Sequence, residues 1–206
     1  KGGGKKQKYY ISVFNYLRGE DKYSWDVPLC TDEELADAAR VLALYHNTVF
    51  GWKAKNKWEK PNFLEYIPLV IKKWNHYTQK ATGRSAFEGY FLGQFDYLLR
   101  FLRGFMTFPG QKRYHMMPHV VIHGDYHPGN LKFQDEKVVG VFDFDWAKRD
   151  TRCFDVCLAV SYFCTSWEGS KDGELLFDRV ELFLNAYQQA AKELNRLGAL
   201  NDLELQ

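Results

Sequence analysis

Two short stretches decide how this chain folds: HGDYHPGN at residues 123–130 and FDFD at residues 142–145. An apolar run at 120–122 precedes the first stretch, and two further apolar segments, 131–133 and 138–142, lie between the two stretches. Short apolar segments separated by a polar break are typical of β-strands joined as a hairpin. The pattern therefore predicts a strand, a polar loop, and a hairpin that ends at an aspartate.

The polar residues of these stretches have the spacing of a phosphoryl-transfer site. Asp125 lies five residues before Asn130, and Asp143 lies thirteen residues after Asn130. In such a site one carboxylate accepts the proton of the attacking hydroxyl, while an amide oxygen and a second carboxylate hold Mg²⁺ against the nucleotide phosphates. Asp125 alone would be interpreted as a turn residue before Pro-Gly. The three together favour Asp125 as the catalytic base and Asn130 and Asp143 as metal ligands.

Three neighbouring polar residues have more than one interpretation. His123 and His127 flank Asp125, as in the metal cluster of a binuclear phosphoesterase. Such enzymes also need an upstream Asp-x-His and a downstream Gly-Asn-His, which this sequence lacks. We therefore interpret His123 as a residue that fixes the loop by hydrogen bonds and His127 as a loop or substrate-side residue. Asp145 is either a third acidic contact, to the metal or to a cationic substrate, or a solvated carboxylate.

These motifs, followed by FDVCLA at 154–159, resemble the aminoglycoside phosphotransferase and choline kinase-like family, which includes type II homoserine kinases. The resemblance is most specific from 120 to 160. It extends to 9–46, where VFNYLRGE at 13–20 resembles the hinge between the two lobes of that family. Residues 50–118 show only the expected helical character. The resemblance implies a protein-kinase-like fold and a small-molecule kinase.

The resemblance also implies roles for single residues. ATP would be the co-substrate and Mg²⁺ the cofactor, with Asp125, Asn130 and Asp143 in the roles given above. Asp155 would brace the catalytic loop from beneath, although an aspartate at a helix N-terminus would also be favoured by the helix dipole. His46 matches a family histidine, which we interpret as a core residue with satisfied hydrogen bonds.

A nucleotide site is implied in the same way. Tyr16 and Leu17 would offer hinge backbone groups to the adenine, and Phe133 and Phe142 would form the floor beneath it. Lys132 departs from the family, which has an apolar residue under the adenine. Either the aliphatic stem of Lys132 covers the ring, or the register of the hairpin differs. The choice between ATP and GTP therefore stays open.

The family places a small, strand-rich lobe with a glycine-rich phosphate loop before the hinge. KGGGKK at 1–6 is interpreted as a connector, because a Gly-Lys-Ser/Thr sequence does not occur there. We expect residues 1–19 to hold this connector, a strand at 9–15 that is the last of the small lobe, and the hinge. Residues 20–206 would form the large lobe of a longer kinase whose N-terminal lobe lies outside this chain. The pattern at 201–204 is typical of the start of a helix.

The expected fold class is mainly α with a small β-hairpin (α+β), as in the C-terminal lobe of protein kinases. TDEE at 31–34 is a capping box, which predicts the start of a helix with one apolar face. Further helices are expected at 62–79, 85–106, 154–165 and 174–197. The apolar stripe of the helix at 85–106 is interpreted as core.

Charge and composition exclude several classes of partner. The net charge is only +2 and the basic residues are scattered, which argues against nucleic acid. No apolar run reaches the roughly 20 residues that span a bilayer, so we expect no membrane partner and a cytoplasmic location. Cys153, Cys157 and Cys164 recur at helical spacing without a zinc motif. We interpret them as buried, reduced thiols.

These observations lead to one main hypothesis. The chain is expected to be an ATP- and Mg²⁺-dependent phosphotransferase that acts on a hydroxyl of a small amino-bearing metabolite or aminoglycoside. Its partners would be ATP and that hydroxyl acceptor. The alternative is a kinase-like binding or scaffold module without turnover. The identity of the acceptor and the oligomeric state stay open.

Overall fold

The computed structural model describes residues 13, 15–53, 60–167 and 172–205. Its elements are α1 (Asp32–Val49), α2 (Phe63–Thr78), α3 (Ala86–Phe105), α4 (Phe108–Met116), β1 (His119–Ile122), β2 (Leu131–Gln134), β3 (Lys137–Val141), β4 (Lys148–Thr151), α5 (Arg152–Phe163), α6 (Phe177–Leu194) and α7 (Asp202–Leu205), with short 3₁₀ turns η1 (Pro128–Asn130) and η2 (Phe144–Trp146). The predicted class, mainly helical with a small hairpin, is confirmed. The strand expected at 9–15 falls almost wholly outside the described residues.

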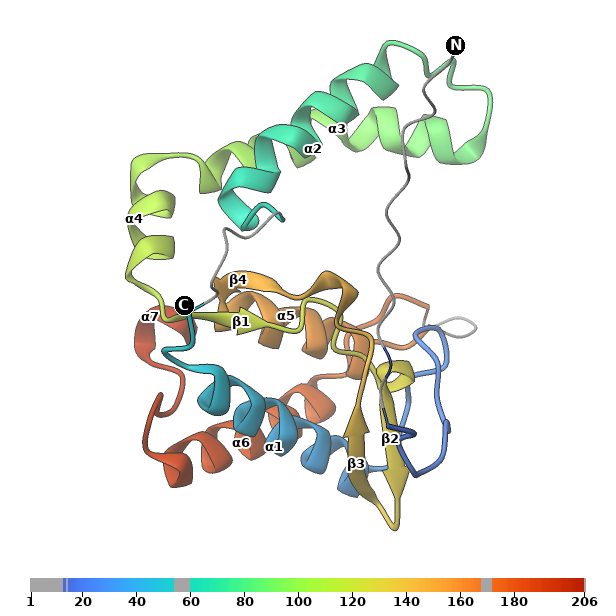
Figure 1. The fold of residues 1–206 in the computed structure, drawn as a ribbon. Helices are drawn as coiled ribbons and strands as arrows, with labels where there is room; N and C mark the ends of the chain where they lie inside the picture. The colour runs from blue at the N-terminus through green and yellow to red at the C-terminus, as the bar shows by residue number, and fades with distance from the viewer. Residues whose placement is uncertain (1–12, 14, 54–59, 168–171, 206) are drawn as a thin grey trace, which may run out of the picture.

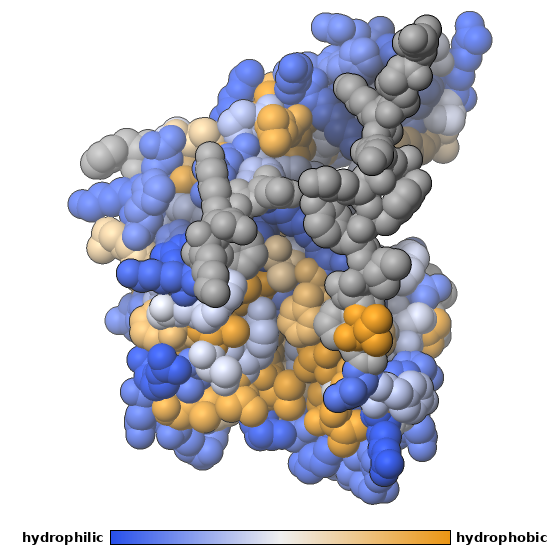
Figure 2. All heavy atoms as spheres, viewed as in Figure 1, coloured by the Kyte–Doolittle hydropathy of each residue, from blue (hydrophilic) through white to orange (hydrophobic). Residues whose placement is uncertain are grey.

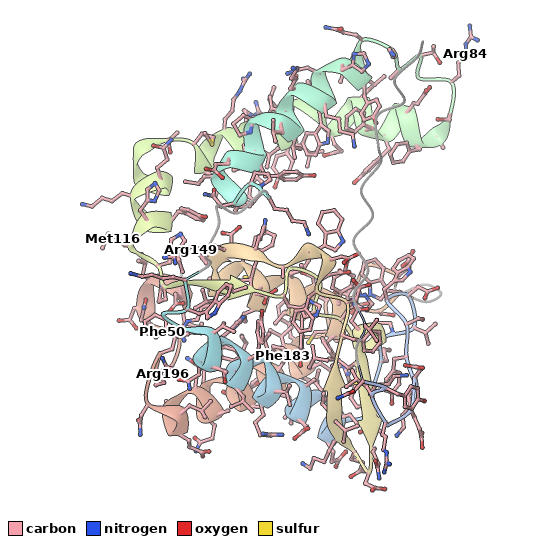
Figure 3. The ribbon with its side chains drawn as sticks, viewed as in Figure 1. Phe50, Arg84, Met116, Arg149, Phe183 and Arg196 are labelled. Carbon is pink, nitrogen blue, oxygen red and sulfur yellow. The ribbon has the colours of Figure 1, made fainter. Side chains whose placement is uncertain are left out.

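Helix α1 begins where the capping box predicted. The Thr31 hydroxyl accepts a hydrogen bond from the Glu34 N–H at 3.2 Å, and the Glu34 carboxylate accepts one from the Thr31 N–H at 3.2 Å. The buried face of α1 packs against α6, and with α5 these helices enclose the main core. Figure 1 shows α1 and α6 side by side in the lower body, and Figure 3 places Phe183 of α6 inside it.

Helices α2 and α3 form a hairpin that projects from this body, with Arg84 at its tip (Figures 1 and 3). Both predicted helices are confirmed within one residue at each end. The interpretation of the α3 stripe as core is correct only in part. Leu99 is buried, whereas, because α2 covers only one side of α3, the other stripe residues are half-buried: Phe91, Phe95, Leu98 and Leu102. Figure 2 shows mostly hydrophilic residues over this hairpin, whereas hydrophobic residues gather in the middle of the lower body with hydrophilic ones along its edges.

Strand β4 and helix α4 were not predicted. β4 has the polar sequence KRDT, yet it pairs antiparallel with β1, with Ile122 opposite Lys148 and His119 opposite Thr151. Its Asp150 is completely buried. The Asp150 carboxylate accepts hydrogen bonds from the Phe63 N–H at 2.7 Å and the Tyr114 hydroxyl at 2.8 Å. One buried carboxylate therefore attaches the start of α2 and the helix α4 to the body.

The predicted hairpin is confirmed as β2 and β3, with one irregularity. Lys132 is opposite Gly140, but Phe133 is opposite Val138, so Val139 is the extra residue of a β-bulge. A bulge bends the strand and changes which side chains face each surface. The hairpin register thus departs from regular pairing next to Lys132, where the sequence departs from the family.

The C-terminal third follows the prediction with shifted boundaries. Helix α5 begins at Arg152, two residues earlier than expected, because Thr151 caps it. Cys164 is buried, as expected, whereas Cys157 is exposed and Cys153 is half-buried, since only part of α5 faces the core. In the part of the chain that the structure describes, no helix is long and apolar enough to cross a membrane.

Candidate active site

The loop after β1 is held from beneath by one carboxylate. Asp155, in the first turn of α5, is completely buried and accepts hydrogen bonds from the backbone N–H groups of His123 and Gly124, each at 2.9 Å. Gly124 has φ +78°, and a Cβ there would lie 2.5 Å from the Trp146 carbonyl oxygen, so this turn requires glycine. The loop is therefore fixed through its backbone.

His123 joins the two sequence stretches to each other. Its ring Nε2 lies 2.9 Å from the Phe142 carbonyl oxygen, and its Nδ1 accepts a hydrogen bond from the Asp125 N–H at 3.3 Å. A carbonyl oxygen can only accept, so the proton of the neutral ring is on Nε2. His123 is completely buried. The contact places Asp143, the next residue after Phe142, beside the loop that carries Asp125.

Asn130 orients Asp125 directly. Its side-chain N–H₂ donates to the Asp125 carbonyl oxygen at 2.9 Å and to the Asp125 carboxylate at 3.4 Å. The backbone carbonyl oxygen of Asn130 accepts a hydrogen bond from the Phe142 N–H at 3.1 Å, which ties Asn130 to the end of the hairpin as well. Since the amide nitrogen is used by Asp125, the side-chain oxygen of Asn130 is the atom that can bind a cation.

Two aromatic rings flank the Asp125 carboxylate. His127 Nε2 lies 3.7 Å from the carboxylate oxygen, and its Nδ1 accepts from the Gly129 N–H at 3.1 Å. Tyr162 of α5 lies against the His127 ring, with centroids 5.1 Å apart, and its hydroxyl interacts with Asp125. Sequence reasoning did not find Tyr162, because it lies on a helix 37 positions after Asp125 and no motif contains it.

The environment shifts the pKa values of both His127 and Tyr162. Burial lowers the pKa of His127 below its ordinary value, although the negative charge of Asp125 opposes this effect. Burial and the Asp125 carboxylate both raise the pKa of Tyr162. At neutral pH the carboxylate therefore faces a neutral imidazole and a neutral phenol, each able to donate a hydrogen bond.

Asp143 and Asp145 lie at the end of the β2–β3 hairpin, in and next to the turn η2. Asp143 has a left-handed backbone, φ 60° and ψ 65°, and its carboxylate accepts from the Asp145 N–H at 3.4 Å. Although an apolar strand precedes it, Asp143 is exposed. Asp145 is exposed as well.

The hinge segment lies across the β2–β3 hairpin. Glu20 pairs with Phe133 through two backbone hydrogen bonds of 2.8 and 3.1 Å. Leu17 packs against Gly140, whereas Tyr16 is exposed. The Phe133 side chain lies on the side of β2 that faces away from Leu17. It is completely buried there and packs edge-on against Tyr23. Because it has no exposed surface, Phe133 cannot form the floor of a nucleotide site as expected.

Lys132, and not Phe133, lies on the side of the strand that faces the hinge. Adjacent strand residues face opposite sides, so Lys132 points toward the hinge. Its ammonium group pairs with Asp21 and lies 5.7 Å from the centre of the Phe142 ring. Only 14% of the side chain is exposed, so its aliphatic stem forms part of the surface between hinge and hairpin.

The chain is similar to known phosphotransferases. The model of the phosphotransferase enzyme family matches residues 2–200. A homoserine kinase from Methylobacillus glycogenes is 37% identical over 67 residues, which are 32% of this chain and 20% of that protein. A homoserine kinase from Janthinobacterium sp. (strain Marseille) is 33% identical over 104 residues, which are 46% of this chain and 31% of that protein. The matched regions thus cover less than a third of either relative.

Two solved structures share the fold. An aminoglycoside-3'-phosphotransferase of type VIII has a TM-score of 0.53 at 16% identity, over 92% of this chain and 63% of that one. An aminoglycoside phosphotransferase from Alicyclobacillus acidocaldarius subsp. acidocaldarius DSM 446 has a TM-score of 0.52 at 15% identity, over 88% of this chain and 52% of that one. The expected architecture is confirmed, and the chain spans less than two thirds of either structure.

Proposed function

Because the chain belongs to the phosphotransferase enzyme family, we propose that it carries the active site of an ATP- and Mg²⁺-dependent small-molecule kinase. The observation that supports this most is the geometry at Asp125, where Asn130 donates a hydrogen bond to the carboxylate and His127 and Tyr162 lie beside it. A carboxylate held from several sides in a partly exposed position suits a group that receives a reacting hydroxyl.

Asp125 acts as the general base in this proposal. The oxygen of the acceptor hydroxyl attacks the γ-phosphorus, the bond between that phosphorus and the β,γ-bridging oxygen breaks, and the hydroxyl proton passes to Asp125. In a loose transition state the proton moves late, so orientation of the hydroxyl matters more than a shifted pKa of the base. The hydrogen bond from Asn130 and the proximity of His127 and Tyr162 supply that orientation.

The residues present fit a Mg²⁺ ion. The side-chain oxygen of Asn130 and the carboxylate of Asp143 are hard oxygen donors, and a kinase magnesium site needs only one or two such protein ligands beside phosphates and waters. When bound, Mg²⁺ would neutralise charge on the transferred phosphoryl group. The backbone contacts between His123, Phe142 and Asn130 keep the two ligands on one connected unit.

The nucleotide would lie between the hinge and the hairpin. Backbone groups of Tyr16 and Leu17 would meet the adenine, with Phe142 and the stem of Lys132 beneath it. This revises the expected floor, since Phe133 is buried in the core. The ammonium group of Lys132 stays paired with Asp21, so the stem rather than the charge would cover the ring.

We propose an amino-bearing acceptor. Proteins named homoserine kinase and aminoglycoside phosphotransferase are among the relatives, and both kinds of name imply a substrate with an amino group. Asp145 is exposed next to Asp143 and has no cationic partner among the described residues. Its carboxylate is a candidate for the acceptor's ammonium group.

The proposal is tested by nucleotide turnover. Protein from the full reading frame is incubated with Mg²⁺, ATP or GTP, and a panel that includes homoserine, ethanolamine, choline and an aminoglycoside, with Asp125→Asn as the blank. Release of ADP or GDP that depends on one acceptor and is lost in the blank supports the kinase. Nucleotide binding without release for any acceptor would instead favour a kinase-like binding module.

A further inference from the structure

The first turn of α2 is fixed beside the candidate active site. The Phe63 N–H donates to the buried carboxylate of Asp150 on β4, and Asn62 caps the helix by accepting a hydrogen bond from the Glu65 N–H at 3.0 Å. The start of α2 therefore lies next to β4, above it in Figure 1. Lys60 precedes this cap by two residues, so the same anchor sets where its side chain can reach.

Lys60 lies over an exposed tryptophan. Its Nζ is 5.4 Å from the centre of the Trp146 ring, within the range at which an ammonium group is attracted to an aromatic face. Trp146 is 59% exposed, although tryptophan is highly buried on average. A Cβ on Gly124 would lie 3.3 Å from the Trp146 Cβ. Since Gly124 directly precedes Asp125, the contact of Lys60 with the ring lies beside the loop that carries the proposed base.

Two opposite charges lie at this place without an ion pair among the described residues. No described carboxylate is within 4.0 Å of the Lys60 ammonium group, and no described cation is within that distance of Asp145. Asp145 directly precedes Trp146 in the turn η2. An ammonium group has three N–H donors, so contact with the ring face leaves donors for an anion. The turn thus presents a binding group for an anion and one for a cation.

We propose that Lys60 is a specificity-determining residue. Held by the Trp146 ring, its ammonium group binds a carboxylate of the acceptor, while Asp145 binds the ammonium group of the same molecule. The inference rests on the proposed function, because it concerns the acceptor of that kinase. It narrows the acceptor to a hydroxy amino acid, which carries both charges. An amino alcohol lacks the carboxylate, and an aminoglycoside carries several positive charges that Lys60 repels.

A lysine that merely covers a surface tryptophan would have different consequences. Its removal would expose the ring further and leave the choice of acceptor unchanged. The chain contains a matched control for that case, because Lys73 Nζ lies 5.8 Å from the centre of the exposed Tyr77 ring. Lys73 is on α2 as well, roughly 15 Å along the helix from Phe63. Lys60→Met and Lys73→Met make the same change: each keeps an aliphatic stem and removes the charge.

The test compares acceptors that differ only in the carboxylate. Protein from the full reading frame is assayed with Mg²⁺ and ATP or GTP on an aminoglycoside and on three pairs: homoserine and 3-aminopropan-1-ol, serine and ethanolamine, threonine and 1-aminopropan-2-ol. For at least one pair we expect the wild type to favour the amino acid about tenfold in kcat/KM, the size of one charge-assisted hydrogen bond. Lys60→Met should lose most of this preference through a higher KM for the amino acid. Lys73→Met should keep it.

The aromatic face is tested separately. Trp146→Leu removes the ring that holds Lys60 but leaves the lysine charge, so we expect only part of the preference for the amino acid to be lost. Trp146→Phe retains an aromatic face and should keep more of the preference than Trp146→Leu. Because both side chains are exposed, we expect all of these variants to fold, and the melting temperature checks this.

Calorimetric titration measures the same preference without turnover. Each amino acid and its partner is titrated into protein saturated with Mg²⁺ and a non-hydrolysable nucleotide. Amino-acid binding that is lost in Lys60→Met, without turnover of any acceptor, would refute the kinase and keep the role of Lys60. Turnover with equal kcat/KM within every pair, or with a preference unchanged in Lys60→Met, would overturn the inference and keep the kinase. A wild type that neither binds nor phosphorylates any of the three amino acids would overturn the inference as well.

Discussion

The loop at residues 123–127 and the segment at residues 143–146 serve one site, yet they are built in opposite ways. The loop rests on the buried carboxylate of Asp155, and its His123 is completely buried. The segment is exposed and begins with a left-handed aspartate, whose carboxylate accepts a 3.4 Å hydrogen bond from the Asp145 N–H. The proposed base is thus held in place within the folded protein, whereas the proposed metal ligand lies where phosphates could reach it.

This contrast has a physical reason. A side chain that must orient a hydroxyl is more effective in a rigid environment, because the entropy of ordering that side chain is then paid during folding and not during the reaction. A metal ligand must exchange waters and phosphates and therefore needs access to solvent. The same kind of substitution should therefore have different effects in the loop and in the segment. The first prediction concerns the catalytic rate alone.

Asp125→Asn should have the largest effect. It keeps the size of the side chain but removes the proton acceptor, so we expect kcat to fall by about 10²–10⁴-fold. Affinity for the nucleotide, measured by titration calorimetry with Mg²⁺, should stay within twofold. Turnover above a tenth of the wild type would show that Asp125 is not the base. The melting temperature provides the control for folding.

The paired substitutions Asp155→Asn and Asp145→Asn test the contrast between the two regions directly. Both remove one negative charge at constant size. Asp155→Asn leaves buried donors unpaired, so we expect a loss of about 3 kcal/mol in the free energy of unfolding. Asp145→Asn, at an exposed carboxylate, should change it by less than about 0.5 kcal/mol. Denaturant unfolding measures both, and equal losses would contradict the contrast.

Asp143→Ala should affect binding rather than stability. Its carboxylate is exposed and its side chain supports little of the fold. We expect the affinity for Mg²⁺-nucleotide to fall at least tenfold, roughly 1.4 kcal/mol, while affinity for nucleotide in the presence of a chelator stays unchanged. A matched loss in both conditions would mean that Asp143 does not act through the metal.

The smallest expected effect is a dependence of stability on pH at His127. Its pKa is lowered by burial, so the unfolded chain binds this proton first as the pH falls. The stabilising contribution is present above about 6.5, the ordinary histidine value, and is lost as the pH falls toward the folded pKa. His127→Asn can still cap the turn at Gly129. Unfolding at several pH values should show that this variant lacks the wild-type loss between neutral and mildly acidic pH.

The local features were accessible to prediction because they depend on residues a few positions apart. The capping box at 31–34 involves contacts within one helical turn, and the hairpin of β2 and β3 pairs two strands that follow each other directly in the sequence. Strand β4 was missed because its polar sequence pairs with β1 about 30 residues earlier, and its buried Asp150 finds partners in α2 and α4. No short window of sequence contains that information.

The sequence by itself determined which residues we propose for the chemistry: the spacing of Asp125, Asn130 and Asp143 follows from one strand, one loop and one hairpin. Only the tertiary structure decided that Phe133 is buried, that Tyr162 meets Asp125, and that Asp143 is exposed. It also decided the buried contacts of His46 with Asp155 and with Tyr187, the latter 141 positions away. Periodicity and caps describe how a segment satisfies its own backbone, whereas a buried polar group is satisfied by whichever distant side chain the packing brings to it.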